Sequence, residues 1–334
     1  MKVGAAGVDT WSVAWYVEPD DVAYDALEAM ATVPAGRGAR LLPDEVEGHR
    51  VGWFPAAGLA FAEGHPRPGG LAGAGDLVPA FERLDRALRD RGIHFTPGRS
   101  RGIPHGASRP VAASGFAGVR RLDLTVDLYF ERGCDGLAAL HGVSALPVPR
   151  VKKATVTEKG GRRLETVYYM GQSGRRLARW YDKGVESGKV GEGVLERGQL
   201  IRPEDQRRFA KDARLGLEHL QAPVLRGLFQ KRFMPLWQAS KGVSVASVDR
   251  IAVRLRELQE AGEITPGQAK AIAGHLVLQR AGAHLQAPRT VRADAALARR
   301  YGLVLAADDA DEVDVDLHEV LEACLEAEAW YGDS

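Results

Sequence analysis

The segment 119–130, VRRLDLTVDLYF, constrains the fold of this chain more tightly than any other. From residue 122 to residue 129 apolar and polar side chains alternate, with Leu122, Leu124, Val126 and Leu128 on one side and Asp123, Thr125, Asp127 and Tyr129 on the other. A period of two is typical of a β-strand that buries one face. Such strands are common in antiparallel sheets, so the segment predicts a sheet of that class.

Further strands and short helices are predicted before residue 200. The strands cover 3–17, a hairpin over 49–64 broken at Pro55–Gly58, and 151–158, 163–171 and 176–183. The last three are separated by Gly160–Gly161 and by 172–174, which is the spacing of β-hairpins. Helices are predicted over 19–30 and 78–92 and near 134–141, from apolar residues at helical spacing.

From Pro203 onward the periodicity is helical. Helices are predicted over 203–220, 222–237, 247–262, 265–282 and 316–330. Ser247 and Thr265 are the expected N-caps of two of them. The order predicts an α+β fold, with a mostly antiparallel sheet domain over residues 1–240 and a helical C-terminal region with an acidic tail over residues 241–334.

Composition excludes several classes of protein. Of the 334 residues, 45% are hydrophobic and 27% are charged, as in soluble globular proteins and unlike disordered or coiled-coil chains. No stretch reaches the roughly 18–20 apolar residues that span a bilayer, so no membrane partner is expected. The two cysteines are far apart and lack a metal-binding spacing. We therefore expect a cytoplasmic protein that neither disulfides nor zinc hold together.

Charge is distributed unevenly along the chain. The formal net charge is +1, but residues 308–334 contain eleven Asp and Glu and no Lys or Arg, which leaves +12 on the preceding residues. A basic body with an acidic tail favours a polyanionic partner such as nucleic acid. The alternative is a solvated surface with a solubilising tail.

Two carboxylates mark the polar side of the predicted strand 119–130. Asp123 and Asp127 are four residues apart, so both project to the same side, about 13 Å from one another. At that separation they do not bind one ion jointly without a bulge in the strand. The alternative is an ordinary solvated sheet face. The sequence contains neither GxxxxGK[ST] nor HExxH, so neither an ATP motor nor that class of metalloprotease is expected.

The segment 176–187, RLARWYDKGVES, contains a candidate nucleophile. Arg179 and Tyr181 alternate onto one face, and Tyr181 ends the predicted strand. A phenol is a weak nucleophile at neutral pH because its ordinary pKa is about 10. Nearby cations favour the phenolate. The candidates are Arg175, Arg176, Arg179 and Lys183. The alternative is an edge-strand tyrosine with its hydroxyl in water.

The segment 198–214, GQLIRPEDQRRFAKDAR, predicts a basic surface. Arg202 and Glu204 flank Pro203 at the expected start of a helix. The basic residues that follow have roughly helical spacing and would form a stripe suited to DNA phosphates. They are Arg207, Arg208, Lys211 and Arg214. Residues 150–214 contain seventeen Lys and Arg against nine Asp and Glu, so positive charge is in excess around Tyr181.

Together these segments resemble the replication initiation factor family (Rep_trans), which comprises rolling-circle initiators of plasmids and filamentous phages and related relaxases. The matching motifs are Arg121-Leu122-Asp123…Asp127, Tyr169-Met170-Gly171…Ser173, Arg179…Tyr181-Asp182-Lys183-Gly184…Glu186 and Arg202-Pro203-Glu204. The match covers about residues 119–210 and, more weakly, the N-terminal strand. The chain departs from the family pattern in MGQSG, where a GSR-type turn is usual, and in the proline of the last motif.

The resemblance implies a site-specific DNA endonuclease and strand transferase. Tyr181 would attack a phosphodiester at an origin, leaving a 5′-phosphotyrosyl intermediate and a free 3′-hydroxyl, and the strand would later be religated. Arg179 and Lys183 would act with Tyr181 on the phosphate. The expected DNA-binding residues are Arg175, Arg176, Arg202, Arg207, Arg208 and Lys211.

The resemblance also implies a divalent ion, Mg²⁺ or Mn²⁺, that would polarise the scissile phosphate. Asp123, Asp127 and Glu204 are the expected ligands because such ions prefer hard oxygen donors, and Glu165 and Glu186 are held in reserve. The expected partner is origin DNA, single-stranded or extruded as a hairpin. A host helicase and a homodimer are left open as further partners.

Two alternatives to a replication initiator stay open. A conjugative relaxase would use the same chemistry at a transfer origin. A non-catalytic DNA-binding initiator or regulator would instead use the C-terminal helices, because two helices within 245–280, joined by AGEITPG, could form a helix-turn-helix-like unit. A plain helical bundle fits that segment equally well.

Overall fold

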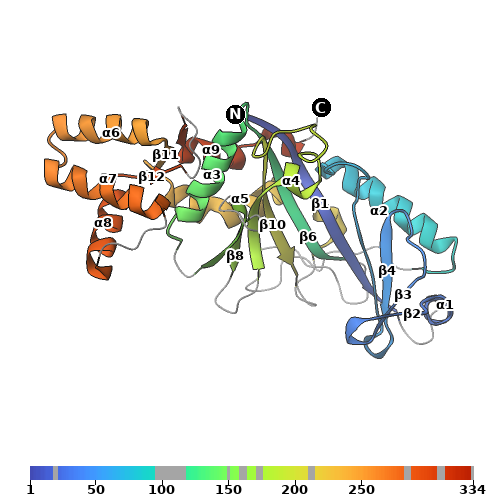
Figure 1. Cartoon of the computed structure of the whole chain (residues 1–334). Helices are drawn as coiled ribbons and strands as arrows, with labels where there is room; N and C mark the ends of the chain where they lie inside the picture. Colours follow the sequence, from blue (N-terminus) through green and yellow to red (C-terminus); the bar gives the residue numbers. More distant parts are fainter. Residues whose placement is uncertain are drawn as a thin grey trace, which may run out of the picture. The chain divides into compact units, whose positions relative to one another are not determined.

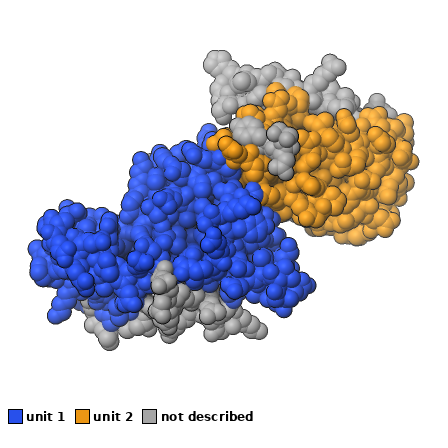
Figure 2. All heavy atoms as spheres, turned by 90° about the horizontal axis from the view of Figure 1, so that it is seen from above, with its two compact units in different colours: residues 1–4, 127–203, 230–327 blue, residues 5–126, 204–229, 328–334 orange. Residues whose placement is uncertain are grey.

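The computed structural model describes residues 1–17, 22–94, 118–148, 151–157, 164–170, 176–209, 215–281, 287–306 and 313–331. As predicted, the fold is α+β, with helices and a large, mostly antiparallel sheet. The chain forms two compact units, coloured separately in Figure 2. Unit 1 comprises residues 1–4, 127–203 and 230–327, and unit 2 comprises 5–126, 204–229 and 328–334. The division at residue 240 stays a prediction.

In unit 2 the strand order is β2-β3-β4-β5-β1-β6-β10, and β1, β6 and β10 each have their other end in unit 1. The pairs from β2 to β1 along this order are antiparallel. The elements are β1 (Lys2–Tyr16), α1 (Val22–Met30), β2 (Val33–Ala35), β3 (Ala39–Leu41), β4 (His49–Phe54), β5 (Leu59–Gly64), α2 (Ala74–Arg89), β6 (Gly118–Tyr129) and β10 (Leu200–Arg208).

Local sequence patterns account for most of unit 2. β4 and β5 form the predicted hairpin, and the chain turns at Gly58, whose φ of 55° is readily adopted by glycine. The predicted helix over 78–92 is α2, and its apolar stripe is buried. The stripe consists of Leu77, Ala80, Phe81, Leu84 and Leu88.

In unit 1 the strand order is β10-β9-β8-β7, and β7, β8 and β9 form the two predicted antiparallel hairpins. The elements are α3 (Gly133–Ala145), β7 (Lys152–Thr157), β8 (Leu164–Met170), β9 (Arg176–Asp182), α4 (Lys183–Glu186), α5 (Ala222–Ala239, shared with unit 2), β11 (Ser244–Ala246), α6 (Val248–Glu260), α7 (Pro266–Ala281), α8 (Pro288–Arg300), β12 (Leu303–Leu305), β13 (Asp314–Asp316) and α9 (Leu317–Leu325).

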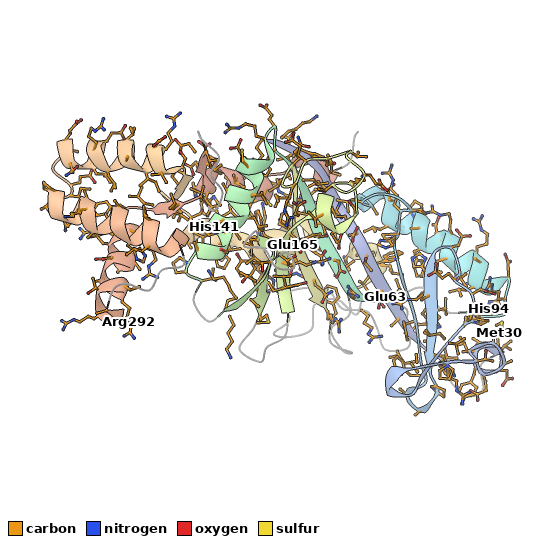
Figure 3. The ribbon with its side chains drawn as sticks, viewed as in Figure 1. Met30, Glu63, His94, His141, Glu165 and Arg292 are labelled. Atoms are coloured by element: carbon orange, nitrogen blue, oxygen red, sulfur yellow. The ribbon has the colours of Figure 1, made fainter. Side chains whose placement is uncertain are left out.

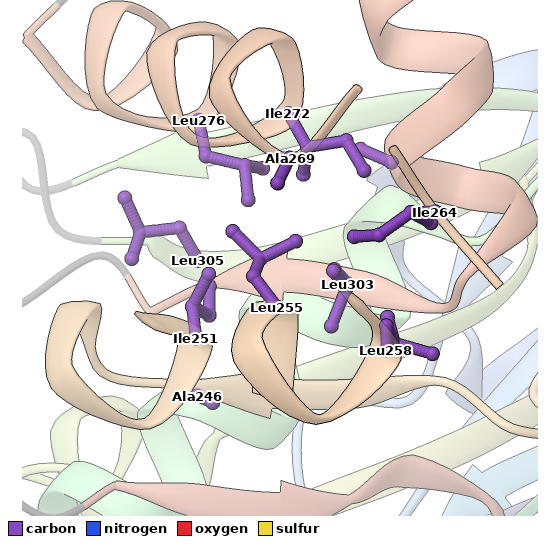
Figure 4. Close-up of a cluster of buried hydrophobic side chains, with 11 residues drawn as sticks. Ala246, Ile251, Leu255, Leu258, Ile264, Ala269, Ile272, Leu276, Leu303 and Leu305 are labelled. Carbon is purple, nitrogen blue, oxygen red and sulfur yellow. The ribbon is translucent and has the colours of Figure 1, made fainter. Parts of the chain in front are cut away.

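The helices α6, α7 and α8 surround an apolar core of their own (Figures 1 and 4). Ile251 and Leu255 of α6 face Ile272 and Leu276 of α7 across this core. A three-stranded sheet, β12-β11-β13, adds Leu305 to it. Helix α8 was not predicted from the sequence. The small sheet was not predicted either, because three-residue strands carry too little pattern to detect.

The helix predicted over 203–220 is wrong. Residues 200–208 form strand β10 instead. Helix propensity is a weak preference, and here sheet neighbours on both sides of the segment supply its backbone hydrogen bonds. On a strand, Arg207 and Arg208 point to opposite faces, so the predicted helical stripe of cations does not form.

Part of the acidic C-terminal segment packs into the fold as a helix. The helix predicted over 316–330 is α9, which ends at Leu325, and its apolar face is buried in unit 1. That face consists of Leu317, Val320, Leu321, Cys324 and Leu325. In the described parts of the chain, no helix is both long and apolar enough to cross a membrane.

Candidate active site

The polar face of β6 is buried. The exposed fractions are 3% for Asp123, 0% for Thr125 and 6% for Asp127, so the solvated sheet face considered from the sequence is wrong. A buried carboxylate costs free energy unless it is paired and hydrogen-bonded. Each of the two aspartates has such a partner.

In unit 2, Asp123 is bound by Arg121 on the same strand. Arg121 Nε donates to Asp123 Oδ1 at 2.9 Å and Nη2 donates to Oδ2 at 2.5 Å. The remaining Arg121 donor reaches Glu63 Oε1 of β5 at 2.8 Å, and Glu63 is labelled in Figure 3. The guanidinium therefore links β6 to β5, the strands on either side of β1, through two carboxylates.

Burial raises the pKa of Asp123 from 3.8 to about 6, although Arg121 acts in the opposite direction. The nearby carboxylates of Glu204 and Asp9, both in unit 2, raise it further. Glu204 is itself 2% exposed. The structure thus brings the predicted pair Asp123 and Glu204 into electrostatic contact.

In unit 1, Asp127 is bound by Arg202 of β10. Arg202 Nε donates to Asp127 Oδ1 at 2.6 Å, and Nη2 donates to Oδ2 at 2.9 Å. The backbone fixes this pairing: Phe130 N donates to Gln199 O, and Phe209 N donates to Arg120 O. Both bonds give the same antiparallel register, which sets Asp127 opposite Arg202.

Of the three predicted metal ligands, Asp127 belongs to unit 1, and Asp123 and Glu204 belong to unit 2. Their hard oxygen donors suit Mg²⁺ or Mn²⁺ in chemistry. Asp123 and Asp127, however, each use both oxygens on a guanidinium. Among the residues that the structure describes, no three His, Cys, Asp or Glu side chains are grouped to hold an ion. The ion and its ligands stay a prediction.

Tyr181 lies near the end of β9 beneath two cations. The Arg179 guanidinium carbon is 4.1 Å from the centre of the Tyr181 ring, and the Lys183 ammonium is 5.9 Å from it. Tyr181 itself is only 1% exposed, so the edge tyrosine with its hydroxyl in water is wrong. The side chains of Arg179 and Lys183 are 28% and 23% exposed, so the cations reach solvent although the ring does not.

Glu186 is the counter-ion of both cations. Its Oε2 accepts from Lys183 Nζ at 2.5 Å, and its Oε1 lies 3.6 Å from Arg179 Nη2. Asp182 holds this turn in place, because its Oδ1 caps α4 at Val185 N and its Oδ2 accepts from Gly198 N. The tyrosine and both cations therefore sit at a strand-to-helix junction that Asp182 fixes.

The two other tyrosines of the hairpin differ in position. Tyr168 is opposite Arg179 in the β8–β9 register, and Tyr181 is opposite Thr166, so Tyr168 shares a face with Tyr181. Tyr169 points the other way, donates to the Val143 carbonyl at 3.0 Å and is fully buried. Burial raises the pKa of Tyr169 well above 10, which makes it a poor nucleophile.

The predicted DNA-binding residues are scattered. Arg175 and Lys211 lie outside the described residues, as does the side chain of Arg176. Arg207 turns inward to Asp205 at 2.5 Å and to the Leu228 carbonyl. Arg208 is exposed. The reserve ligand Glu165, labelled in Figure 3, pairs with Arg197 at 3.1 Å.

Sequence analysis gave no role to two residues that the structure shows to be important in this region. Arg121 was given no role, although a residue two positions from Asp123 on a strand must share its face. Tyr181 and Lys183 were chosen as site residues and Asp182 between them was not, although aspartate directly before a turn is a typical N-cap.

Neither a protein-family model nor a curated protein matches this chain. Among solved structures, a rolling circle replication initiator protein from Geobacillus stearothermophilus is similar over 69% of this chain and 84% of that chain. The sequence identity is 14% and the TM-score is 0.33, which does not establish a shared fold.

Proposed function

We propose that this chain nicks one strand of DNA through Tyr181 and later religates it, as an initiator of rolling-circle replication. The observation that carries the proposal is a tyrosine ring with two cations over it, Arg179 at 4.1 Å and Lys183 at 5.9 Å. Two adjacent cations stabilise both a phenolate and a phosphate. The motif resemblance supports replication initiation as the setting of that chemistry.

The proposed step is a transesterification. The Tyr181 hydroxyl oxygen attacks the phosphorus of a phosphodiester and loses its proton to solvent. The bond from phosphorus to the 3′ oxygen breaks and that oxygen takes up a proton from solvent, which leaves a 5′-phosphotyrosine and a 3′-hydroxyl. Because one ester replaces another, religation needs no external energy source. The divalent ion stays a prediction, and when bound it would stabilise the charge that develops on the phosphate.

Glu186 occupies the position that a phosphate would take in this scheme. Its carboxylate is held by the same two cations that the phosphate needs. A DNA phosphate would exchange with this half-exposed carboxylate, and movement of the two cations would uncover the buried ring. Opening of the site is therefore coupled to phosphate binding.

The test is covalent adduct formation on a supercoiled plasmid that carries the DNA flanking the coding sequence. We expect Tyr181→Phe to reduce nicking and the detergent-resistant protein–DNA adduct by at least about 1,000-fold, since the nucleophilic oxygen is lost. DNA binding should be retained, because the ring and the cations remain.

Tyr168→Phe is the matched control, since Tyr168 lies on the same face one strand away. We expect it to nick at close to the rate of the unmodified chain. Adduct formation by Tyr181→Phe together with its loss in Tyr168→Phe would reassign the nucleophile to Tyr168. Adducts that survive both substitutions would overturn tyrosine chemistry in this hairpin.

A further inference from the structure

Helix α8 presents a row of exposed arginines. Arg289, Arg292, Arg299 and Arg300 are all exposed, and Figure 3 shows Arg292 extending outward from the helix. Thr290, Ala293 and Ala296 are exposed between them. Positions three or four apart share one side of a helix, so these residues form a single face, here named the α8 face.

The opposite side of α8 is fixed to the helical core of unit 1. Ala298 is 2% exposed, and Leu297 and Tyr301 pack against the same core. The Tyr301 hydroxyl also donates to the Glu263 carbonyl at 2.8 Å. The α8 face therefore cannot turn inward, and its direction is set by packing.

The charge of α8 is not balanced. Its thirteen residues include four arginines and one acid, Asp294, whereas the thirteen of α6 include three arginines and three acids. On α6, Arg254 pairs with Glu257 at 3.1 Å. Within the described part of the chain, no salt bridge is found for the four arginines of α8, and only Arg300 lies over an aromatic ring, that of Tyr301.

Helix stability does not explain the first two arginines. A cation near a helix N-terminus opposes the helix dipole, and α8 has no acidic residue in its first turn to offset it. Arg299 and Arg300, in the last turn, do complement the dipole. Arg289, in the first turn, thus costs stability where it stands, and Arg292, in the second turn, gains nothing from the dipole, which favours an anionic partner for the α8 face.

We propose that the α8 face binds duplex DNA in the major groove. Arg289 and Arg300 are eleven residues apart, or about 16 Å along the axis. The groove is about 12 Å wide and admits a helix, so arginines at both ends reach the phosphates that flank it. The small residues between them allow the backbone to approach the base edges.

Other anionic partners fit the α8 face less well. Proteins that bind single strands rely on aromatic side chains for stacking, and the α8 face has none. A helix on a membrane surface needs large apolar residues next to its cations, and here the exposed apolar side chains are alanines. From the sequence, a DNA-binding unit was considered over 245–280; of its two helices, α6 has as many acids as arginines, and α7 has one Lys and one Arg against the four arginines of α8. This proposal concerns duplex binding, not the strand that is cut.

The experiment compares two double variants of the full chain. Arg289→Ala with Arg292→Ala alters the α8 face, and Arg250→Ala with Arg254→Ala removes the same charge from exposed positions of α6. Binding to a fluorescent 20-base-pair duplex of mixed sequence, and to one of its single strands, is measured by anisotropy over a range of salt concentrations. Circular dichroism confirms that both variants fold.

We expect the α8 variant to bind the duplex at least about tenfold more weakly than the α6 variant, with a salt slope smaller by about 2 because two phosphate contacts are lost. Equal losses in both variants, or a single-strand loss as large as the duplex loss, would overturn the proposal. Adduct formation on single-stranded DNA should be unchanged in the α8 variant. A failure of nicking through Tyr181 is therefore distinguishable from a failure of duplex binding.

Discussion

At the scale of single residues, His49 shows how one buried contact fixes a protonation state. Trp11 Nε1 donates to His49 Nε2 at 2.7 Å, and an indole N–H can only donate, so Nε2 carries no proton. The proton on Nδ1 is donated to the Glu47 carbonyl at 2.6 Å. Burial lowers the pKa of His49 below 6.5, more than the Glu47 carbonyl raises it. The imidazole is therefore held neutral.

Because His49 is held neutral, we expect the folded protein to lose stability in acid. Because the pKa is lowered on folding, the unfolded chain binds more protons below about pH 6.5, and the contribution of His49 present above that pH is lost as the pH falls. We expect the difference in unfolding free energy between the unmodified chain and His49→Gln to shrink as the pH is lowered from about 7.5 to about 5. Urea denaturation at several pH values measures it. A difference that stays constant with pH would show that His49 does not titrate in this way.

At the scale of elements, the two helices with predicted N-caps, α6 and α7, begin differently. Thr265 and Gln268 form a capping box at α7: Thr265 Oγ1 accepts from Gln268 N at 3.2 Å, and Gln268 Oε1 accepts from Thr265 N at 2.8 Å. Ser247 stands at the N-cap of α6, yet its buried hydroxyl has no hydrogen-bond partner in the described structure. The backbone N–H of Ser247 donates to the Val313 carbonyl. The two predicted caps therefore agree in position and differ in energy.

We expect Thr265→Ala to lower the free energy of unfolding by about 1 kcal/mol, the usual cost of losing an N-cap. Ser247→Ala is the matched comparison and should change it by less than about 0.5 kcal/mol, because no hydrogen bond is lost. Chemical denaturation of both variants measures the difference. Equal destabilisation would mean that the Ser247 hydroxyl caps α6 in solution.

At the scale of the whole molecule, the buried carboxylates predicted as metal ligands are divided between two compact units. Asp127 belongs to unit 1, and Asp123 and Glu204 belong to unit 2. Both aspartates are neutralised by arginine within their own unit. The motif resemblance implies a divalent ion at these carboxylates, whereas the structure pairs the oxygens of both aspartates with guanidinium groups.

Removal of divalent metal tests whether the predicted ion takes part in nicking. We expect EDTA to stop nicking of the supercoiled plasmid and added Mg²⁺ or Mn²⁺ to restore it, because charge that develops on the phosphate needs a counter-ion. Binding of DNA in EDTA should change little. Nicking that continues at full rate in EDTA would contradict the predicted ion and leave charge neutralisation to the arginines.

Much of the fold follows from local pattern. The alternation over 119–130 determines β6, because a shift of one residue would turn every leucine to the wrong face. The glycines between 151 and 183 determine the hairpins, and the spacing of apolar residues determines α2, α6 and α9. In the candidate site, the sequence alone also placed Arg179 and Tyr181 on one face of one strand.

Tertiary structure decided the rest. The pattern from residue 203 onward predicts a helix, but residues 200–208 form a strand because neighbouring strands complete their hydrogen bonds. Arg202 found its partner Asp127 at a separation of 75 residues, and no local rule relates the two. Burial of Tyr181 likewise depends on elements that meet only after folding, whereas Glu186 pairs with Lys183 within one helical turn. Periodicity is encoded locally, whereas burial and charge pairing depend on contacts between distant segments.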